Sequence, residues 1–452
     1  MLRRELRTKA MGVRALLQHQ TITGALALAL CLVALLATGS GQAYALGEVY
    51  RADEVIVKLR PGVAIEEILA DYPSAERLDE DLPYNLETRN IYLLKAPDDT
   101  DVETFAENLL TNERVDGIAE PNFVAEAPED PADPTYGVAR MKARSISYRK
   151  QSSEANDTFA TNLNLSCARD IKGATVTVLD TGTQLSHPKL EANFKGVKRY
   201  DFVDNDTKPS DKRVGLDEDG DDLKDELAGH GTHVAGIVDQ VAPGAKIMPL
   251  RVLDSEGYGD VYTIARAIAY AERYEVDVIN LSLGTSKHSE LLEEMVEEAT
   301  GNGIVVAAAA GNSGIEEEHY PAAGEYGTGG VDPLTPPRDG LLAVTSVDEN
   351  GVKSDFATYG KWVDISAPGE LIRSTFPRDK YANWTGTSMA TPFISGQAAL
   401  IRMVNGSITP MTIEEKIQGS ARPLRFGVME DENDPQLIGK LGAGHANVCD
   451  SL

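Results

Sequence analysis

Four short stretches of the sequence carry side chains that together could hydrolyse an acyl bond. Asp180 ends an apolar run and is followed by Thr-Gly, whereas His230 lies in Gly-His-Gly-Thr-His and Ser388 in Gly-Thr-Ser-Met-Ala. A serine hydroxyl is a weak nucleophile, so it needs a base, and the base needs a third group that fixes its tautomer and stabilises its cation. The amide of Asn312, which follows an alanine-rich run and a glycine, can donate to an oxyanion. The sequence therefore predicts a nucleophile, a base, an orienting acid and an oxyanion donor: Ser388, His230, Asp180 and Asn312.

The elements around these residues predict how they are positioned. Near-continuous apolar runs alternate with helical patterns from residue 174 on, which indicates a parallel sheet covered on both faces. The predicted strands are 174–179, 246–253, 276–281, 304–309 and 341–347. Asp180 would then lie at the carboxyl edge of the sheet, where catalytic groups collect. We expect His230 and Ser388 at helix starts, the second helix running to about residue 404 with Pro392 in its first turn.

The motifs resemble those of the subtilase family of serine proteases, and they occur in the same order, Asp, His, Ser. α/β-Hydrolases and chymotrypsin-like enzymes use other orders, and the alanine at position 390 excludes a Gly-x-Ser-x-Gly elbow. The resemblance extends from about residue 47 to the end of the chain. It implies an α/β fold over residues 129–452, a subtilisin-like three-layer αβα domain with a mostly parallel sheet. It also implies a serine endopeptidase that acts on proteins or peptides and needs no cofactor for catalysis.

Residues 46–128 predict a smaller α+β domain. Their pattern of strand, helix, strand, strand, helix, strand is a ferredoxin-like order. Three prolines and three acids in residues 127–134 then indicate a linker. By resemblance, this domain is an inhibitory propeptide that is cleaved near residues 127–130, its last strand lying in the substrate groove like a bound product. The chain would thus be a self-processing zymogen with its own propeptide as intramolecular inhibitor.

The resemblance also implies where substrate binds. Substrate would lie as an additional strand between two edge segments, a form of recognition that depends mainly on the backbone. The residues that match these segments and the apolar pocket for the side chain before the scissile bond are Gly257, Tyr258, Gly259, Leu281, Ser282, Leu283, Gly284, Ala309, Ala310 and Gly311. Residues 324–340 form an insertion that either reshapes this pocket or is a surface loop.

An acidic stretch just before His230 raises the question of a metal. Asp217, Asp219, Asp221 and Asp225 have the alternating spacing of calcium ligands, but Asp222 stands where an EF-hand needs glycine. A structural calcium loop and a solvated acidic surface are both compatible with this pattern. His233 follows His230 at three residues without the glutamate of zinc proteases, so we interpret it as structural. We expect the remaining histidines on the surface or in loops.

Composition excludes some classes of partner and indicates the compartment. The 452 residues carry 43 Lys and Arg against 71 Asp and Glu, a net charge of −28, which would repel nucleic acid. Basic residues precede an apolar run at 22–37, and Ala-Tyr-Ala at 43–45 supplies the small-x-small pattern of a signal peptidase site after it. Residues 1–45 therefore predict a signal peptide and a secreted or extracytoplasmic protein without membrane attachment after cleavage. A retained membrane anchor is the alternative.

Two questions stay open at the level of sequence. With Cys31 removed, Cys167 and Cys449 could form a disulfide or remain buried thiols. A binding protein without activity could use the same fold, but the presence of all four catalytic groups argues against it. An esterase would need another order of the triad.

Overall fold

The computed structural model describes residues 49–128, 163, 165–167, 173–215, 224–324, 340–427 and 433–452. Residues 47–452 form one compact unit. The predicted signal peptide and the linker beyond Pro128 lie outside the described residues.

The N-terminal domain, residues 49–128, contains a four-stranded antiparallel sheet and two helices. Its strands lie in the order β2-β3-β1-β4, with β1 between β3 and β4, which is the ferredoxin-like arrangement. The second strand of the predicted order has only two residues, and a long connection leads from it to β3. The elements are β1 Tyr50–Leu59, α2 Ile65–Asp71, β2 Glu76–Arg77, η1 Glu87–Arg89, β3 Ile91–Lys95, α3 Val102–Leu110 and β4 Val115–Glu126.

The two faces of this small sheet are buried against different partners. Successive side chains of a strand point to opposite faces, and in β1 Val55 and Val57 belong to the N-terminal domain's own core. Ile56, between them, belongs instead to the core cluster of the large domain. The N-terminal domain therefore lies with one face of its sheet against the large domain, where β4 contacts α7 and α8.

The large domain is built on a seven-stranded parallel sheet in the order β12-β11-β10-β9-β5-β7-β6. All five predicted strands are present, whereas β6 and β12, with two and four residues, are too short to give a sequence pattern. The strands are β5 Thr175–Asp180, β6 Tyr200–Asp201, β7 Lys246–Arg251, β9 Val278–Leu281, β10 Val305–Ala309, β11 Leu341–Val347 and β12 Ile365–Pro368.

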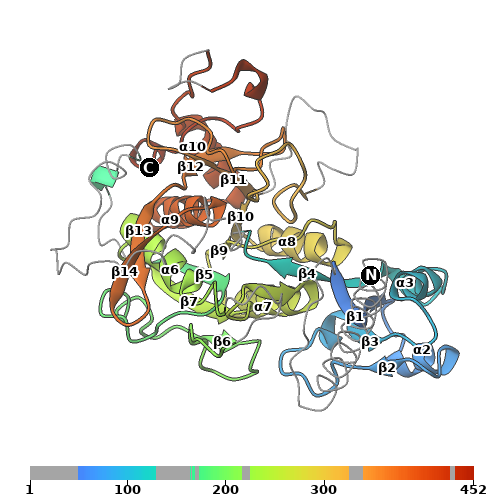
Figure 1. The fold of residues 1–452 in the computed structure, drawn as a ribbon. Helices are drawn as coiled ribbons and strands as arrows, with labels where there is room; N and C mark the ends of the chain where they lie inside the picture. Colours follow the sequence, from blue (N-terminus) through green and yellow to red (C-terminus); the bar gives the residue numbers. More distant parts are fainter. Residues whose placement is uncertain are drawn as a thin grey trace, which may run out of the picture. The chain divides into compact units, whose positions relative to one another are not determined.

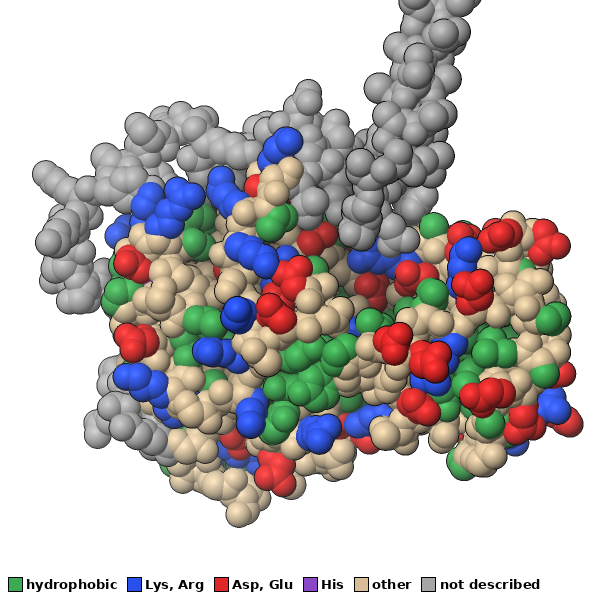
Figure 2. All heavy atoms as spheres, turned by 90° about the horizontal axis from the view of Figure 1, so that it is seen from below, with side chains coloured by type: hydrophobic (Ala, Val, Ile, Leu, Met, Phe, Trp, Pro, Cys, Tyr) green, Lys and Arg blue, Asp and Glu red, His purple; other side chains and the backbone are tan. Residues whose placement is uncertain are grey.

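Helices cover both faces of the sheet, which gives the predicted three layers (Figure 1). Helices α6 and α9 pack against each other on one face, and α7 and α8 on the other. The helices and remaining strands are α6 His230–Val241, β8 Tyr258–Asp260, α7 Val261–Arg273, α8 Glu290–Gly301, β13 Ile372–Phe376, β14 Lys380–Trp384, α9 Thr387–Asn405 and α10 Pro410–Ser420. On the face shown in Figure 2, Lys and Arg side chains lie among the Asp and Glu side chains, so the negative net charge is not gathered in one patch there.

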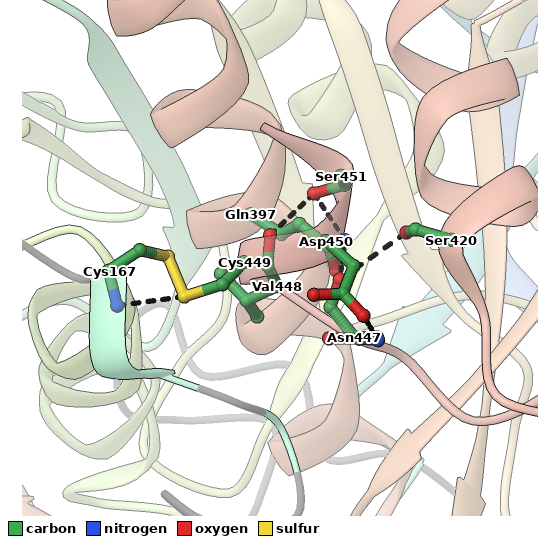
Figure 3. The surroundings of a disulfide bond; sticks show 8 residues. All are labelled: Cys167, Gln397, Ser420, Asn447, Val448, Cys449, Asp450 and Ser451. Atoms are coloured by element: carbon green, nitrogen blue, oxygen red, sulfur yellow. Dashed lines mark hydrogen bonds between the residues drawn. A yellow bond between two sulfur atoms is a disulfide. The ribbon is translucent and has the colours of Figure 1, made fainter.

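The two remaining cysteines form a disulfide, which decides the question left open by the sequence. Cys167, in η2 Leu165–Cys167, is bonded to Cys449, in η5 Cys449–Ser451 (Figure 3). The C-terminal segment is also held by Gln397 of α9, whose amide donates to the Asn447 carbonyl and to Ser451 Oγ (3.2 and 2.9 Å). The end of the chain is thus fixed to the central helix and to the start of the large domain.

Candidate active site

Asp180 and His230 meet at the carboxyl edge of the sheet. Asp180 is the last residue of β5 and His230 the first of α6. His230 Nδ1 lies 2.7 Å from Asp180 Oδ1, and both side chains are at most 1% exposed. The ring of Trp384 packs edge-on against the His230 ring, with centroids 5.4 Å apart. The carboxylate can therefore fix the orientation of the imidazole, as a general base requires.

Glycines allow α6 to approach β5 this closely. A Cβ on Gly231 would lie 2.1 Å from the Gly182 carbonyl oxygen and 2.9 Å from Asp180 Oδ1. Gly229, before the helix, has φ +113°, and a Cβ there would clash with Phe376. Glycine is thus required on both sides of His230, as its sequence motif suggested.

Asp211 anchors the start of α6 and was not identified from the sequence. Its carboxylate accepts from the Gly229 and Thr232 backbone N–H groups (2.6 and 3.1 Å) and from Thr232 Oγ1 (2.6 Å). A carboxylate is favourable at the positive end of a helix, although burial raises the pKa of Asp211 to about 6. Its position 19 residues before His230 gave no pattern from which this role could be predicted.

Ser388 is the second residue of α9, at the positive end of the helix. The prediction that Pro392 lies in the first turn is wrong, because the helix begins at Thr387 and Pro392 is its sixth residue. Proline lacks the N–H that would bond to the carbonyl four residues before it, which is that of Ser388. Ser282 Oγ donates to this carbonyl instead, at 2.9 Å, and Ser388 Oγ donates to the Ser282 carbonyl at 3.2 Å.

A buried polar chain below Ser282 continues this connection. Asn280 Nδ2 donates to Ser282 Oγ at 3.0 Å, and Ser395 Oγ donates to Asn280 Oδ1 at 2.8 Å. Ser282, Asn280 and Ser395 are completely buried. These hydrogen bonds connect strand β9 to two turns of α9. The supporting role of the Asn280 and Ser395 side chains was not predicted from the sequence.

Asn312 follows β10 and faces the start of α9. Its Oδ1 accepts from the backbone N–H and from Oγ1 of Thr387, both at 2.9 Å. Since the amide oxygen is held by these two donors, the Nδ2 group is the part of the side chain that can donate elsewhere. The side chain is thus oriented as an oxyanion donor beside Ser388 must be.

The predicted substrate segments flank a strand of the chain itself. Residues 124–126 of β4 pair antiparallel with β8, with Ala125 opposite Gly259 and Glu126 opposite Tyr258. On the other side, Glu126 and Gly284 exchange both backbone hydrogen bonds, at 2.8 and 2.9 Å. Ala127 N–H then donates to the Gly257 carbonyl at 3.0 Å. An extended segment therefore lies between the two edges, in the position that the sequence analysis assigned to substrate.

The predicted pocket residues follow two neighbouring strands. Leu281 ends β9 and Ala309 ends β10, and these strands pair in parallel, so Ser282–Gly284 and Ala310–Gly311 lie beside each other at the same edge. His319 lies behind both glycines: a Cβ on Gly284 would come within 2.3 Å of its Nε2, and one on Gly311 within 3.2 Å of its Cγ. Burial lowers the pKa of His319 to about 4, so the imidazole is neutral at pH 7. The sequence predicts only a surface or loop position for His319, and nothing near it in the chain indicates its contact with both glycines.

Two other histidines lie outside the helices and main strands, as expected, but they are not exposed. His187 and His445 are buried, not on the surface. His233 agrees with its structural interpretation, because its Nε2 lies 3.0 Å from the Ile372 carbonyl and burial lowers its pKa to about 3. It therefore connects α6 to β13 as a neutral ring.

Of the four residues predicted to bind calcium, Asp217, Asp219 and Asp221 lie outside the described residues. Asp225 is described, and its Oδ1 accepts from the Val214 and Gly215 N–H groups and from Ser255 Oγ, at 2.7 to 2.8 Å. These donors show that Asp225 holds its own loop together. No cluster of three or more metal-ligating side chains is found within the described ranges.

Comparison with known proteins identifies the family. The profile of the subtilase family matches residues 171–444, which include all four candidate catalytic residues. The chain belongs to the subtilase family. A thermophilic serine proteinase of Bacillus sp. (strain AK1) is 34% identical over 347 residues, 74% of this chain and 75% of that protein. Thermitase of Thermoactinomyces vulgaris is 40% identical over 239 residues, 51% of this chain and 75% of that protein.

The family match and the thermophilic serine proteinase show that this subtilase is a serine endopeptidase. Subtilisin BL of Lederbergia lenta is 36% identical over 261 residues, 56% of this chain and 84% of that protein. Among solved structures, a cold adapted subtilisin-like serine proteinase is 28% identical, covers 62% of this chain and 88% of its own, and has a TM-score of 0.48. None of the helices in the described part of the subtilase has the length and apolar character needed to span a membrane.

Proposed function

We propose that this subtilase is an exported, self-processing zymogen whose peptidase activity depends on Asp180, His230 and Ser388. Ser388 Oγ attacks the peptide carbonyl while His230 takes its proton, and His230 then returns the proton to the leaving amine. Asp180 orients the imidazole and stabilises its cation. Asn312 Nδ2 and the Ser388 N–H donate to the oxyanion, the interaction that contributes most in such reactions.

The observation that carries this proposal is the strand of residues 124–126 between β8 and Gly284. Extended peptides are recognised by addition to a sheet edge, in which backbone hydrogen bonds supply affinity and side-chain pockets supply specificity. The chain's own segment has this geometry beside the candidate triad. We therefore infer that substrates bind along the same line and that residues 46–128 act as the inhibitory propeptide.

The register of this strand indicates which bond is cut. Glu126 lies opposite Gly284, so in a continuous antiparallel ladder Pro128 lies opposite Ser282. Ser388 Oγ is hydrogen-bonded to the Ser282 carbonyl. The carbonyl of Pro128 would thus be the one nearest the nucleophile, and the scissile bond would be Pro128–Glu129, within the predicted range.

Proline at this position has a consequence for the rate of processing. Its missing N–H cannot donate to the Ser282 carbonyl, so the ladder ends one hydrogen bond early at the reacting residue. Processing at Pro128 would therefore be slower than at a residue with an N–H. The small and apolar pocket predicted from Leu283 to Gly284 and Ala309 to Gly311 is compatible with a proline ring.

Export and calcium binding stay proposals that rest on the sequence. The signal peptide supports a secreted or extracytoplasmic location. A structural calcium ion would have to be held by Asp217, Asp219 and Asp221, because the hydrogen bonds of Asp225 already engage its carboxylate.

A serine-directed covalent probe tests the assignment of the nucleophile. A peptidyl phosphonate with an apolar side chain should label the purified processed chain at Ser388 and block peptide hydrolysis. Ser388→Ala should abolish both, whereas Ser420→Ala, a matched change in α10, should leave both unchanged. Labelling at another serine in the Ser388→Ala variant would refute the assignment.

A further inference from the structure

The N-terminal domain contacts the large domain through a second element besides the groove strand. The connection between β2 and β3, residues 78–90, leaves its own sheet and carries Leu86 into the core cluster of the large domain, where its side chain is 1% exposed. Leu82 packs against the same cluster. This segment is far longer than a hairpin needs. Its apolar side chains Leu82 and Leu86 pack against the core of the large domain.

Tyr84, at the tip of this connection, lies among aromatic side chains of the large domain. Its ring is edge-on to Tyr200 and Tyr270, with centroids 4.8 and 4.9 Å away, and Phe202 follows at 6.4 Å. Tyr84 has φ +56°, an uncommon backbone conformation for a tyrosine. Edge-on contacts of this kind add attraction beyond the burial of apolar area.

Polar groups fix the same segment on both sides of Tyr84. Arg266 of α7 donates from Nη2 to the Pro83 carbonyl at 2.5 Å, and Tyr262 of the same helix donates its hydroxyl to Asp79 Oδ2 at 2.6 Å. Asp79 is completely buried. Arg89, at the end of the segment, forms ion pairs with Glu272 and Glu298.

We propose that Tyr200, Phe202, Tyr262, Arg266 and Tyr270 form an exosite that binds residues 79–89 independently of the substrate groove. The aromatic rings and the arginine fit a turn in which a tyrosine follows a proline and a buried acid precedes both. Two linked contacts hold a partner more tightly than either alone, because release of one leaves the other bound. The cleaved propeptide therefore stays on the enzyme after its groove strand is displaced.

The inference rests on the proposed role of residues 46–128 as propeptide, so its test avoids self-processing. In the full Ser388→Ala chain, a recognition site for a foreign site-specific protease is placed within residues 129–162, and that protease makes the cut. The dissociation rate of the released N-terminal domain is then measured by native mass spectrometry after dilution. Whether wild type cuts itself is determined separately and bears only on the proposed function.

Three variants decide the outcome. Tyr84→Ala removes the central aromatic contact. Tyr262→Phe removes one hydroxyl group from the large domain and leaves the sequence of the N-terminal domain unchanged. Tyr72→Ala is the matched control, because Tyr72 packs on Phe105 within the N-terminal domain. We expect Tyr84→Ala to dissociate at least tenfold faster than the parent, Tyr262→Phe at least threefold faster, and Tyr72→Ala at most twofold faster. The exosite is refuted if either Tyr84→Ala or Tyr262→Phe is no faster than Tyr72→Ala.

Discussion

The orientation of Asn312 shows how a single neighbour can prepare a residue for catalysis. An amide side chain can present either its oxygen or its nitrogen, and only the nitrogen can donate to an oxyanion. Thr387 holds the oxygen through its N–H and its hydroxyl. The residue that precedes Ser388 thus has a positioning role of its own.

Thr387→Val should therefore reduce activity without weakening substrate binding. The backbone N–H remains, but the hydroxyl contact at 2.9 Å is lost. We expect kcat to fall about tenfold with KM unchanged, less than the 100- to 1,000-fold typical when a whole oxyanion donor is removed from a subtilisin. Thr391→Val, which removes a buried hydroxyl one turn later in α9, is the control. An unchanged kcat, or equal losses in both variants, would contradict the positioning role.

The reacting residues could be predicted from the sequence because each lies in a local motif. Glycines flank His230 because a Cβ there would clash, and Gly386, two residues before Ser388, has φ +155°. Such short-range constraints leave a pattern in the local sequence. Asp211, Asn280 and His319 act through contacts with residues distant in the chain, so nothing near them in sequence marks them. The disulfide between Cys167 and Cys449 spans 282 residues. The sequence identified these two cysteines as the possible partners, but it did not show whether they form a bond.

At the scale of elements, a side-chain hydrogen bond replaces a missing backbone hydrogen bond in the first turns of α9. Pro392 leaves the Ser388 carbonyl without its helical donor, and Ser282 Oγ takes that place. Ser282→Ala should remove this hydrogen bond from the buried Ser388 carbonyl, which costs about 1–3 kcal/mol in the free energy of unfolding. Pro392→Ala restores an N–H in the helix, so in the double variant most of this loss should be recovered. Urea unfolding of these variants in the Ser388→Ala chain measures both effects, and equal stability of the single and double variants would contradict the explanation.

The disulfide ties the two ends of the large domain together. Replacing Cys167 and Cys449 by serine should lower stability by about 2–5 kcal/mol, the range typical when a native disulfide is removed. The C-terminal turn should then exchange its amide hydrogens faster, because it loses its covalent link and keeps only non-covalent contacts, such as the hydrogen bonds of Gln397, Ser420 and Lys416. Hydrogen exchange of residues 445–452 measures this, and protection equal to that of the parent would show that those contacts suffice.

At the scale of the whole molecule, the interface between the two domains contains one buried and one half-buried carboxyl group, Glu120 and Glu54. Glu120 of β4 accepts from Ser289 Oγ and from the Glu290 and Leu291 N–H groups at the start of α8, and burial raises its pKa to about 7. The pKa of Glu54 is also raised to about 7, mainly because of burial and secondly because of the nearby charge of Asp260. Both values lie well above the 4.5 of an exposed glutamate.

The docked state therefore binds more protons than the released state between about pH 4.5 and 7, so docking weakens as the pH rises through this range. We expect the cut N-terminal domain to dissociate at least tenfold faster at pH 8 than at pH 5, with little further change above pH 8. Glu120→Gln, which stays neutral, should show a smaller pH dependence. Dissociation that is equally fast at both values, or faster at pH 5, would disprove this sign.

The fold at this scale was predicted where periodicity is strong, as in the five main strands of the parallel sheet. The way in which the N-terminal domain lies on α7 and α8 was not, because side chains such as Ile56 and Leu86 look like ordinary core residues in sequence. Which of two cores they join is decided only when both domains are present.

Self-processing by Ser388 can be measured from the intact mass and N-terminal sequence of the purified chain, expressed from residue 46 beside its Ser388→Ala variant. We expect wild type to lose everything up to Pro128 and to begin at Glu129, whereas Ser388→Ala should keep its full length. A wild-type chain that retains its N-terminal domain, or a Ser388→Ala chain that loses it in the same way, would contradict self-processing by Ser388.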